Sequence, residues 1–335
     1  AENLQTTLIW EHFSESDDRL RSSKQLCKTE PIPTAVDGIP TPAPGGQDSA
    51  ATNLGGYLTQ GCLPTSLYSA DAFEVPNGYG LPYVTGGEIF GVINPNIDPY
   101  ASTTQSQNLR IIQSTIDPVY KVKNDTVELN AEYSVNPTLT LVSQTGFSQD
   151  ALYSSEDYNR FNTSPGIFLP KPGDPTLISS SGVFCDPQLG CTDRLVAEDL
   201  STEHAWQLNQ EFRLASNFSG PFNFSFGANY LHYETEENYY VFINALTAFA
   251  AAGSRGLPGG PPFGPWVPGV SDDSECLIFF GYGHLLDPRQ KTGAGEPGVN
   301  QCIYVDPNPI PSVNNLGHNY FLSQNPYTLN SYAGF

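Results

Sequence analysis

The clearest feature of the chain is a two-residue alternation of apolar and polar side chains in WQLNQEFRLASNFSGPFNFSFGANYLHYETEE, residues 206–237. One set of positions is Trp206, Leu208, Gln210, Phe212 and Leu214, then Phe222, Phe224, Phe226, Ala228 and Tyr230. The positions between them are Gln207, Asn209, Glu211 and Arg213, then Asn223, Ser225, Gly227 and Asn229. Side chains alternate between the two faces of a strand, so this period predicts a β-hairpin over Glu203–Glu236.

Four more strands are predicted by the same pattern. They are Asn3–Phe13, Lys123–Val135, Thr138–Gln149 and Tyr327–Phe335. In the second of these, Val127, Leu129, Ala131, Tyr133 and Val135 share one face, and Asn136-Pro137 forms the following turn. The chain is therefore expected to be all-β, with about six long antiparallel strands.

Short turns and long loops alternate strictly between these strands. The long connections run from about Ser14 to about Tyr120, over about 50 residues before Glu203, and over about 90 residues after Glu236, against a usual length of about 4–6. A short helix is expected near Asn244–Ala252. All short turns thus fall at one end of the sheet, as in outer-membrane barrels with short periplasmic turns and long extracellular loops. A soluble sandwich shows the same alternation but no such sorting.

Composition narrows the function classes. The chain has 14 Lys+Arg against 35 Asp+Glu, a net charge of -21, which argues against a nucleic-acid partner. It has no run of 18 apolar residues, so no transmembrane helix is expected. Transmembrane strands are not excluded by this, because about 9–11 tilted residues suffice for a strand to cross a bilayer. The chain has no Met, and we expect it to be a processed product or an excerpt.

The cysteines fall into three pairs that are local in sequence. They are Cys27 and Cys62, Cys185 and Cys191, and Cys276 and Cys302. Each pair lies in a predicted loop, and none forms the C-x-x-C spacing of zinc or redox motifs. Three structural disulfides formed in an oxidising compartment are expected, the alternative being free buried thiols.

Several stretches resemble TonB-dependent outer-membrane receptors. The hairpin of residues 206–237 resembles their barrel strands, and TLIWEHFSESDDRLRSSKQLC resembles a strand that enters a cysteine-bearing outer loop. QGCLPTSLYSADAF looks like a later part of that loop, and YTLNSYAGF like a returning strand. The resemblance implies a 22-stranded barrel with an internal plug. Its expected role is uptake of an iron chelate, cobalamin or a glycan, driven by the TonB complex.

The chain departs from that family in having about six strands and neither a plug domain nor a TonB box. Residues 1–335 are therefore expected to be part of one receptor-like barrel domain, an incomplete barrel. The implied location is the outer membrane of a Gram-negative bacterium. The implied partners are outer-membrane lipid, a small solute or metal chelate, and the TonB complex through parts of the protein outside this chain.

No catalytic motif is present, so the chain is expected not to be an enzyme, and no cofactor or metal site is expected. The candidate ligand-binding residues are Glu128, Glu132, Glu211, Arg213, Phe263 and Trp266. The charged four share the polar face, where they could line a solute path, contact a plug, or form a ladder of opposite charges between strands. The two aromatics could bind a ligand or pack the core of their own loop.

Two other classes remain open. A secreted all-β carbohydrate-binding module would show the same alternation and disulfides. A secreted β-rich hydrolase would use paired carboxylates, although no spacing points to a particular pair. Partitioning into detergent separates the membrane class from both.

Overall fold

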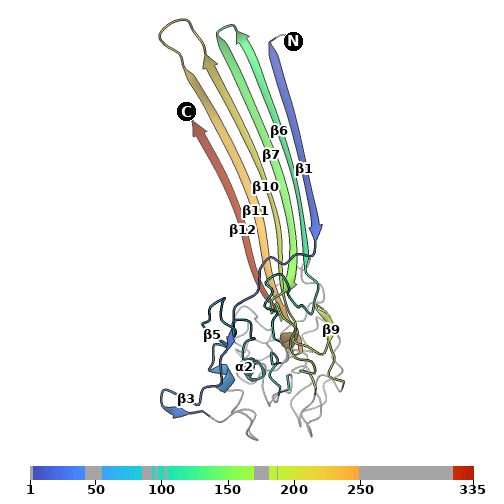
Figure 1. The fold of residues 1–335 in the computed structure, drawn as a ribbon. Coiled ribbons are helices and arrows are strands. Elements are labelled where there is room, and N and C mark those ends of the chain that lie inside the picture. The colour runs from blue at the N-terminus through green and yellow to red at the C-terminus, as the bar shows by residue number, and fades with distance from the viewer. Residues whose placement is uncertain are drawn as a thin grey trace, which may run out of the picture.

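The computed structural model describes residues 3–41, 55–84, 93–94, 97–101, 104–169, 181–186, 188–248 and 320–335. The all-β prediction is confirmed, because the long strands form a six-stranded antiparallel sheet in the order β1-β6-β7-β10-β11-β12 (Figure 1). These strands are β1 (Leu4–Asp17), β6 (Val119–Asn136), β7 (Leu139–Asp157), β10 (Ala197–Ser216), β11 (Ser225–Ile243) and β12 (Phe321–Gly334). The sheet is open, with β1 and β12 as its edges, and the described residues contain no closed barrel.

The remaining elements are short and lie at the loop end of the sheet (Figure 1). They are β2 (Lys28–Thr29) with β5 (Cys62–Leu63), β3 (Ala35–Val36) with β4 (Ile39–Pro40), β8 (Phe184–Asp186) with β9 (Gly190–Thr192), and helix α2 (Gly80–Val84). Residues 244–248 are also helical, as expected for the start of the third long loop. None of the helices among the described residues is long and apolar enough to span a membrane.

Every long strand extends farther toward the loops than its alternation predicted. The strand predicted to end at Gln149 continues to Asp157, and the one predicted to begin at Tyr327 begins at Phe321. The last four residues of β7 are all buried, since loops cover both faces of the sheet there. Alternation disappears wherever both faces are covered, so the pattern located only the strand segments near the turns.

Cross-strand register confirms the predicted faces for the positions within the strands, whereas Phe222 and Phe224 fall before β11, which begins at Ser225. Val127 lies opposite Phe147, and Phe147 lies opposite Leu208, so these residues share one surface. We call this surface the apolar face and the opposite one, with Glu128 and Asn209, the polar face. Val135 is an exception to the predicted pattern, because a register shift at Ser134/Asn136 leaves it outside the ladder.

Near the turns the sheet is a single layer. Both faces of β1 are exposed from Leu4 to Ser14, and the side chains of Leu8 and Trp10 are 69% and 68% exposed. In the part of the chain that the structure describes, no second sheet packs on the apolar face, and the other sheets have two strands each. An ordinary hydrophobic core is therefore absent from this half of the described molecule.

The buried core lies at the loop end instead. One cluster joins Ile167, Phe168, Phe184 and Leu195 to the helix of residues 244–248. A second cluster consists of Leu200, Tyr240, Phe242 and Tyr320, with Leu189 packed against it. We call the described residues of 18–118, 158–196 and 244–248 the loop cap. Its packing is what covers both faces of the strands at that end.

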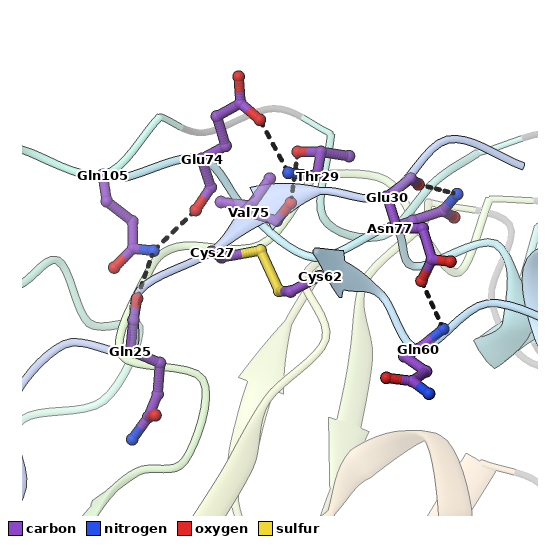
Figure 2. The surroundings of a disulfide bond; sticks show 10 residues. All are labelled: Gln25, Cys27, Thr29, Glu30, Gln60, Cys62, Glu74, Val75, Asn77 and Gln105. Carbon is purple, nitrogen blue, oxygen red and sulfur yellow. Dashed lines mark hydrogen bonds between the residues drawn. A yellow bond between two sulfur atoms is a disulfide. The ribbon is translucent and has the colours of Figure 1, made fainter. Parts of the chain in front are cut away.

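Disulfides brace the loop cap as predicted. Cys27 bonds to Cys62, and Cys185 bonds to Cys191 across the β8–β9 hairpin. Cys276 and Cys302 lie outside the described residues. Figure 2 shows the polar contacts around the first bridge, where the Gln105 amide donates to the carbonyl oxygens of Gln25 and Glu74.

More hydrogen bonds hold the strands on either side of this bridge. The Thr29 backbone N–H donates to the Glu74 carboxylate at 2.8 Å, and the Gln60 backbone N–H donates to Glu30 at 2.7 Å (Figure 2). The Asn77 amide completes the set by donating to the Glu30 carbonyl at 3.0 Å. The disulfide therefore joins segments that polar contacts already hold together.

A segment of the loop cap, residues 18–24, crosses the polar face at its loop end, and we call it the strap. The chain leaving β1 runs across the base of the sheet in Figure 1. The Arg21 guanidinium bonds to the carboxylate of Asp199 and donates to the Ser201 hydroxyl on β10. The Ser22 hydroxyl donates to Glu156 of β7 at 2.6 Å. The strap thus links the edge strand to the middle of the sheet.

Replacing Arg21→Ala should loosen the strap. It leaves the Asp199 carboxylate, a buried charge, without its guanidinium partner, and losing a hydrogen bond to a charged group costs about 1–3 kcal/mol. Hydrogen–deuterium exchange over residues 18–24 should become faster. The matched control is Arg19→Ala, whose guanidinium pairs with Glu15 in an exposed position and should matter little. Equal effects of the two variants would contradict the role assigned to Arg21.

Candidate functional site

The polar face is strongly acidic along its whole length. Arg213 is the basic residue that the six strands place on it. The acidic residues that register places there are Glu11, Glu15, Asp17, Glu128, Glu132, Asp150, Glu156, Asp199, Glu203, Glu211 and Glu237. A surface lined by one sign of charge raises the local concentration of the opposite ion. This face is therefore suited to cations.

A hollow opens in the middle of the polar face, with a volume of about 260 Å³. Gly146 on β7 forms its floor, between Glu128 on β6 and Asn209 on β10, which lie directly opposite it in the register. The residues lining the hollow are Glu128, Asn130, Gln144, Thr145, Gly146, Asn209, Glu211 and Asn229. Two carboxylates and four side-chain amides thus surround one glycine.

The missing side chain of Gly146 leaves the space of the hollow open, although the backbone conformation there would accept another residue. A Cβ at residue 146 would meet only the Asn209 Cβ, at an ordinary contact distance of 3.9 Å. A side chain at this position would stand in the hollow and fill it. Glycine inside a strand weakens the strand, and such positions often mark the close approach of a ligand.

The carboxylates of the hollow are free to act on a ligand. Within the described residues, neither Glu128 nor Glu211 forms an ion pair or accepts a hydrogen bond through its carboxylate. By contrast, the Asn229 amide donates to the Asn209 side-chain oxygen at 2.8 Å, which orients that pair. The site can therefore offer unpaired negative charge and oriented amide oxygens.

The structure brings together two of the predicted ligand residues and separates the others. Glu128 and Glu211 line the same hollow, whereas Glu132 and Arg213 lie nearer the turns and outside it. β6 and β10 are separated by β7, and none of these four side chains forms an ion pair with a described residue. A ladder of opposite charges on adjacent strands is therefore not formed. Phe263 and Trp266 lie outside the described residues.

Sequence reasoning missed Gly146, Asn130, Gln144, Asn209 and Asn229 as site residues. The signal for the first was available, since an isolated glycine within an alternating strand marks a bulge or a close approach. The amides gave no such signal, because a polar residue at every second position is ordinary for a strand. Their convergence follows from the register of strands far apart in the chain.

No group of described residues could hold a metal ion. Two acids of the loop cap, Asp98 and Asp186, serve structure. Asp98 accepts hydrogen bonds from the backbone N–H groups of Gly78 and Tyr100 at 3.0 and 2.8 Å. Asp186 accepts them from Gln188 and Leu189 at 2.7 and 3.2 Å. Burial raises the pKa of both carboxyls above the ordinary value, because the charged form loses its hydration.

These raised pKa values make the loop cap sensitive to pH. A carboxyl with a raised folded-state pKa contributes stability that is full below its ordinary pKa of 3.8 and is lost as pH rises through the folded pKa. Asp186→Asn removes the titration. From pH 4 to pH 8 the free energy of unfolding of the wild type should therefore fall relative to that of the variant. Asp37→Asn, at an exposed loop position, is the control. A wild-type-to-variant difference independent of pH would contradict this account of Asp186.

Comparisons with family models, curated proteins and solved structures found no match to this chain. Similarity to known proteins therefore assigns neither a family nor an activity. The features of the described residues that bear on function are the uncovered apolar face, the acidic polar face and the hollow at Gly146.

Proposed function

We propose that this chain is part of the β-barrel of a TonB-dependent outer-membrane receptor that takes up a scarce solute. The observation that carries the proposal is the uncovered apolar face of a single-layer sheet. Exposed contiguous apolar surfaces of this extent in water mark binding or membrane contact, and otherwise promote aggregation. Lipid is the partner that fits a face whose apolar rows run across β1, β6, β7, β10 and β11. A carbohydrate-binding sandwich would need a second sheet over it.

The apolar face carries a band without full charges. The band begins at the turn end with a row of opposed residues, Leu4, Tyr133, Leu141, Leu214 and Phe226. It ends with the row of Trp10, Val127, Phe147 and Leu208. At about 3.4 Å per residue, the six steps from Leu4 to Trp10 cover about 20 Å, comparable with the band of about 25 Å in outer-membrane barrels.

Aromatic side chains mark the loop-side border of the band. The Trp10 indole N–H points toward the Asp125 carboxylate at 3.4 Å, and Asp125 also contacts the His12 ring at 2.7 Å. The Trp206 ring lies 4.5 Å from that of His232. Tryptophan favours membrane–water interfaces, where its ring is apolar and its N–H reaches water or a polar partner. Charged residues follow on the far side of this border.

Gln210, an amide in the middle of the band, has hydrogen-bond partners for all its polar atoms. The Gln210 amide accepts a hydrogen bond from the Thr145 hydroxyl at 2.6 Å and donates to Ser143 and to the Glu211 carbonyl at 3.1 and 3.0 Å. In hydrocarbon, an unpaired polar group costs several kcal/mol because no water can replace its partner. This local network makes Gln210 compatible with a lipid-facing position.

The free edge of β12 fits pairing within the band. Gly227 and Phe335 exchange both backbone hydrogen bonds, and from there bonded and non-bonded pairs alternate along the antiparallel ladder. Pro326, opposite Glu236, falls in a non-bonded pair, so its nitrogen points away from β11. The edge groups of Thr328, Asn330, Tyr332 and Gly334 can therefore accept a further strand up to Pro326. The proposed barrel closes by such pairing, because an open edge does not occur in lipid.

The two ends of the sheet support an orientation. Short connections, of two residues between β6 and β7 and eight between β10 and β11, lie at one end, and long disulfide-bearing loops lie at the other (Figure 1). We assign the turns to the periplasm and the loop cap to the outside, where oxidising conditions keep disulfides intact. The class of solute, an iron chelate, cobalamin or a glycan, and the use of TonB energy are what the resemblance of residues 206–237 to the barrel strands of TonB-dependent receptors implies.

Phe212→Arg tests the lipid contact. Phe212 is 53% exposed on the apolar face, so arginine there would be harmless in a soluble protein. On the lipid face it should cost about 2–4 kcal/mol. The protein encoded by the complete gene should be expressed in a Gram-negative host and fractionated. Phe212→Arg should then reduce the outer-membrane fraction whose gel mobility shifts on boiling.

The matched control is Gln207→Arg, on the same strand but the polar face, which should leave that fraction unchanged. A wild-type protein that is soluble and indifferent to detergent, with Phe212→Arg harmless, would overturn the proposed location. Attention would then turn to glycan binding by a secreted module.

A further inference from the structure

We infer that the hollow above Gly146 binds the cationic group, a guanidinium or a protonated amine, of the solute that enters along the polar face. The inference rests on the proposed function only in taking the polar face as the inside of the barrel. Its evidence is the charge, spacing and shape of the hollow itself.

The charge of the hollow selects a cation. Glu128 and Glu211 bring two carboxylates that no described residue neutralises, and no lysine or arginine lines the hollow. A guanidinium carries five N–H donors and no acceptor, so it needs only acceptors around it. The carboxylates and the amide oxygens of Asn130 and Gln144 supply them. An anion would meet uncompensated repulsion at the same place.

The spacing selects an organic cation rather than a metal ion. Glu128 lies on β6 and Glu211 on β10, two strand spacings apart and offset by two residues along the strands, so their backbones are about 12 Å apart. A metal ion needs several oxygens within about 2.6 Å, and no described group offers such a set. A planar guanidinium or a hydrated ammonium can instead lie on the glycine between the two carboxylates. The volume of about 260 Å³ accommodates a group of that size.

The acidic surface continues from the hollow toward the loop cap. Asp150 is the next carboxylate of β7 on this face, and beyond it Glu203 on β10 lies directly opposite Glu237 on β11. Like charges directly opposite each other destabilise a pair of strands. A passing cation relieves that repulsion, so the same residues that weaken the sheet favour entry of a positive group.

Gly146 offers a direct way to close the site. Gly146→Leu places a side chain in the hollow without a backbone clash, because a Cβ there meets only Asn209 at 3.9 Å. Leucine is also better than glycine inside a strand, so the variant should fold. The boiling-dependent shift in gel mobility shows whether a variant is folded. The effect of filling or neutralising the hollow can therefore be distinguished from unfolding.

The test is calorimetric titration of the complete detergent-solubilised protein with N-acetyl-arginine amide at low salt. N-acetyl-citrulline amide, its neutral analogue, should bind at least about 10-fold more weakly, since hydrogen bonds to charged groups contribute about 1.5–3 kcal/mol each. Glu128→Gln with Glu211→Gln should weaken arginine binding by about 10-fold or more, and Gly146→Leu should abolish it. Glu132→Gln, compared with Glu128→Gln alone, is the matched control, because each removes one negative charge from the same face of β6, and Glu132 lies outside the hollow.

Equal binding of the two probes, or an equal loss in Glu132→Gln and in Glu128→Gln, would overturn the inference. So would absence of arginine binding by a wild-type protein that is correctly inserted in the outer membrane. That last result would leave the receptor proposal standing, because insertion is judged by Phe212→Arg and fractionation. Conversely, arginine binding that depends on Glu128 and Glu211 in a soluble protein would support the hollow and reject the membrane location.

Discussion

The register of the six-stranded sheet is the constraint on which the rest of the molecule depends. Side chains alternate with a period of two, so slipping one strand by one residue would exchange its apolar and polar faces. The pairing of β7 with β10 is central, because it joins two hairpins that a long loop separates in sequence. It places Phe147 beside Leu208 on one face and Gly146 beside Asn209 on the other. Both the continuous apolar band and the hollow follow from this one alignment.

Burial is distributed unusually, because the sheet near the turns has little core of its own. The tightly packed residues lie at the loop end of the sheet, where Phe168 and Leu195 of the loop cap and Phe242 of β11 are almost fully buried. Two disulfides link segments within the loop cap, and the Arg21–Asp199 contact holds the strap to β10. This division suits a protein whose strands take their apolar environment from lipid and whose loops must be stable in water. It also places an ordered cap over the acidic end of the polar face.

The two faces of the sheet can serve one function together. The apolar face suits lipid, because tryptophans lie at its border and the Gln210 amide is hydrogen-bonded to neighbouring side chains. The polar face, acidic along its length, leads from the loop cap to a hollow without a compensating cation among the described residues. A receptor needs both a surface that anchors it and an interior that attracts its solute. In this chain, alternate residues of the same strands supply an apolar face and an acidic face, the two surfaces that the proposed receptor would need.

The amino-acid sequence by itself determined the all-β class, the two-faced strands, the sorting of turns and loops, and the two disulfides that the described residues contain. Each of these depends on neighbours in the chain: alternation at i and i+2, turn residues at Asn136-Pro137, or cysteines within one loop. The extension of β7 to Asp157 was hidden, since loops bury both faces there and erase the alternation. That Glu128 and Glu211 line one hollow was decided only by tertiary structure. Their separation spans β7 and a long loop, and no local pattern records which residues of distant strands lie opposite each other.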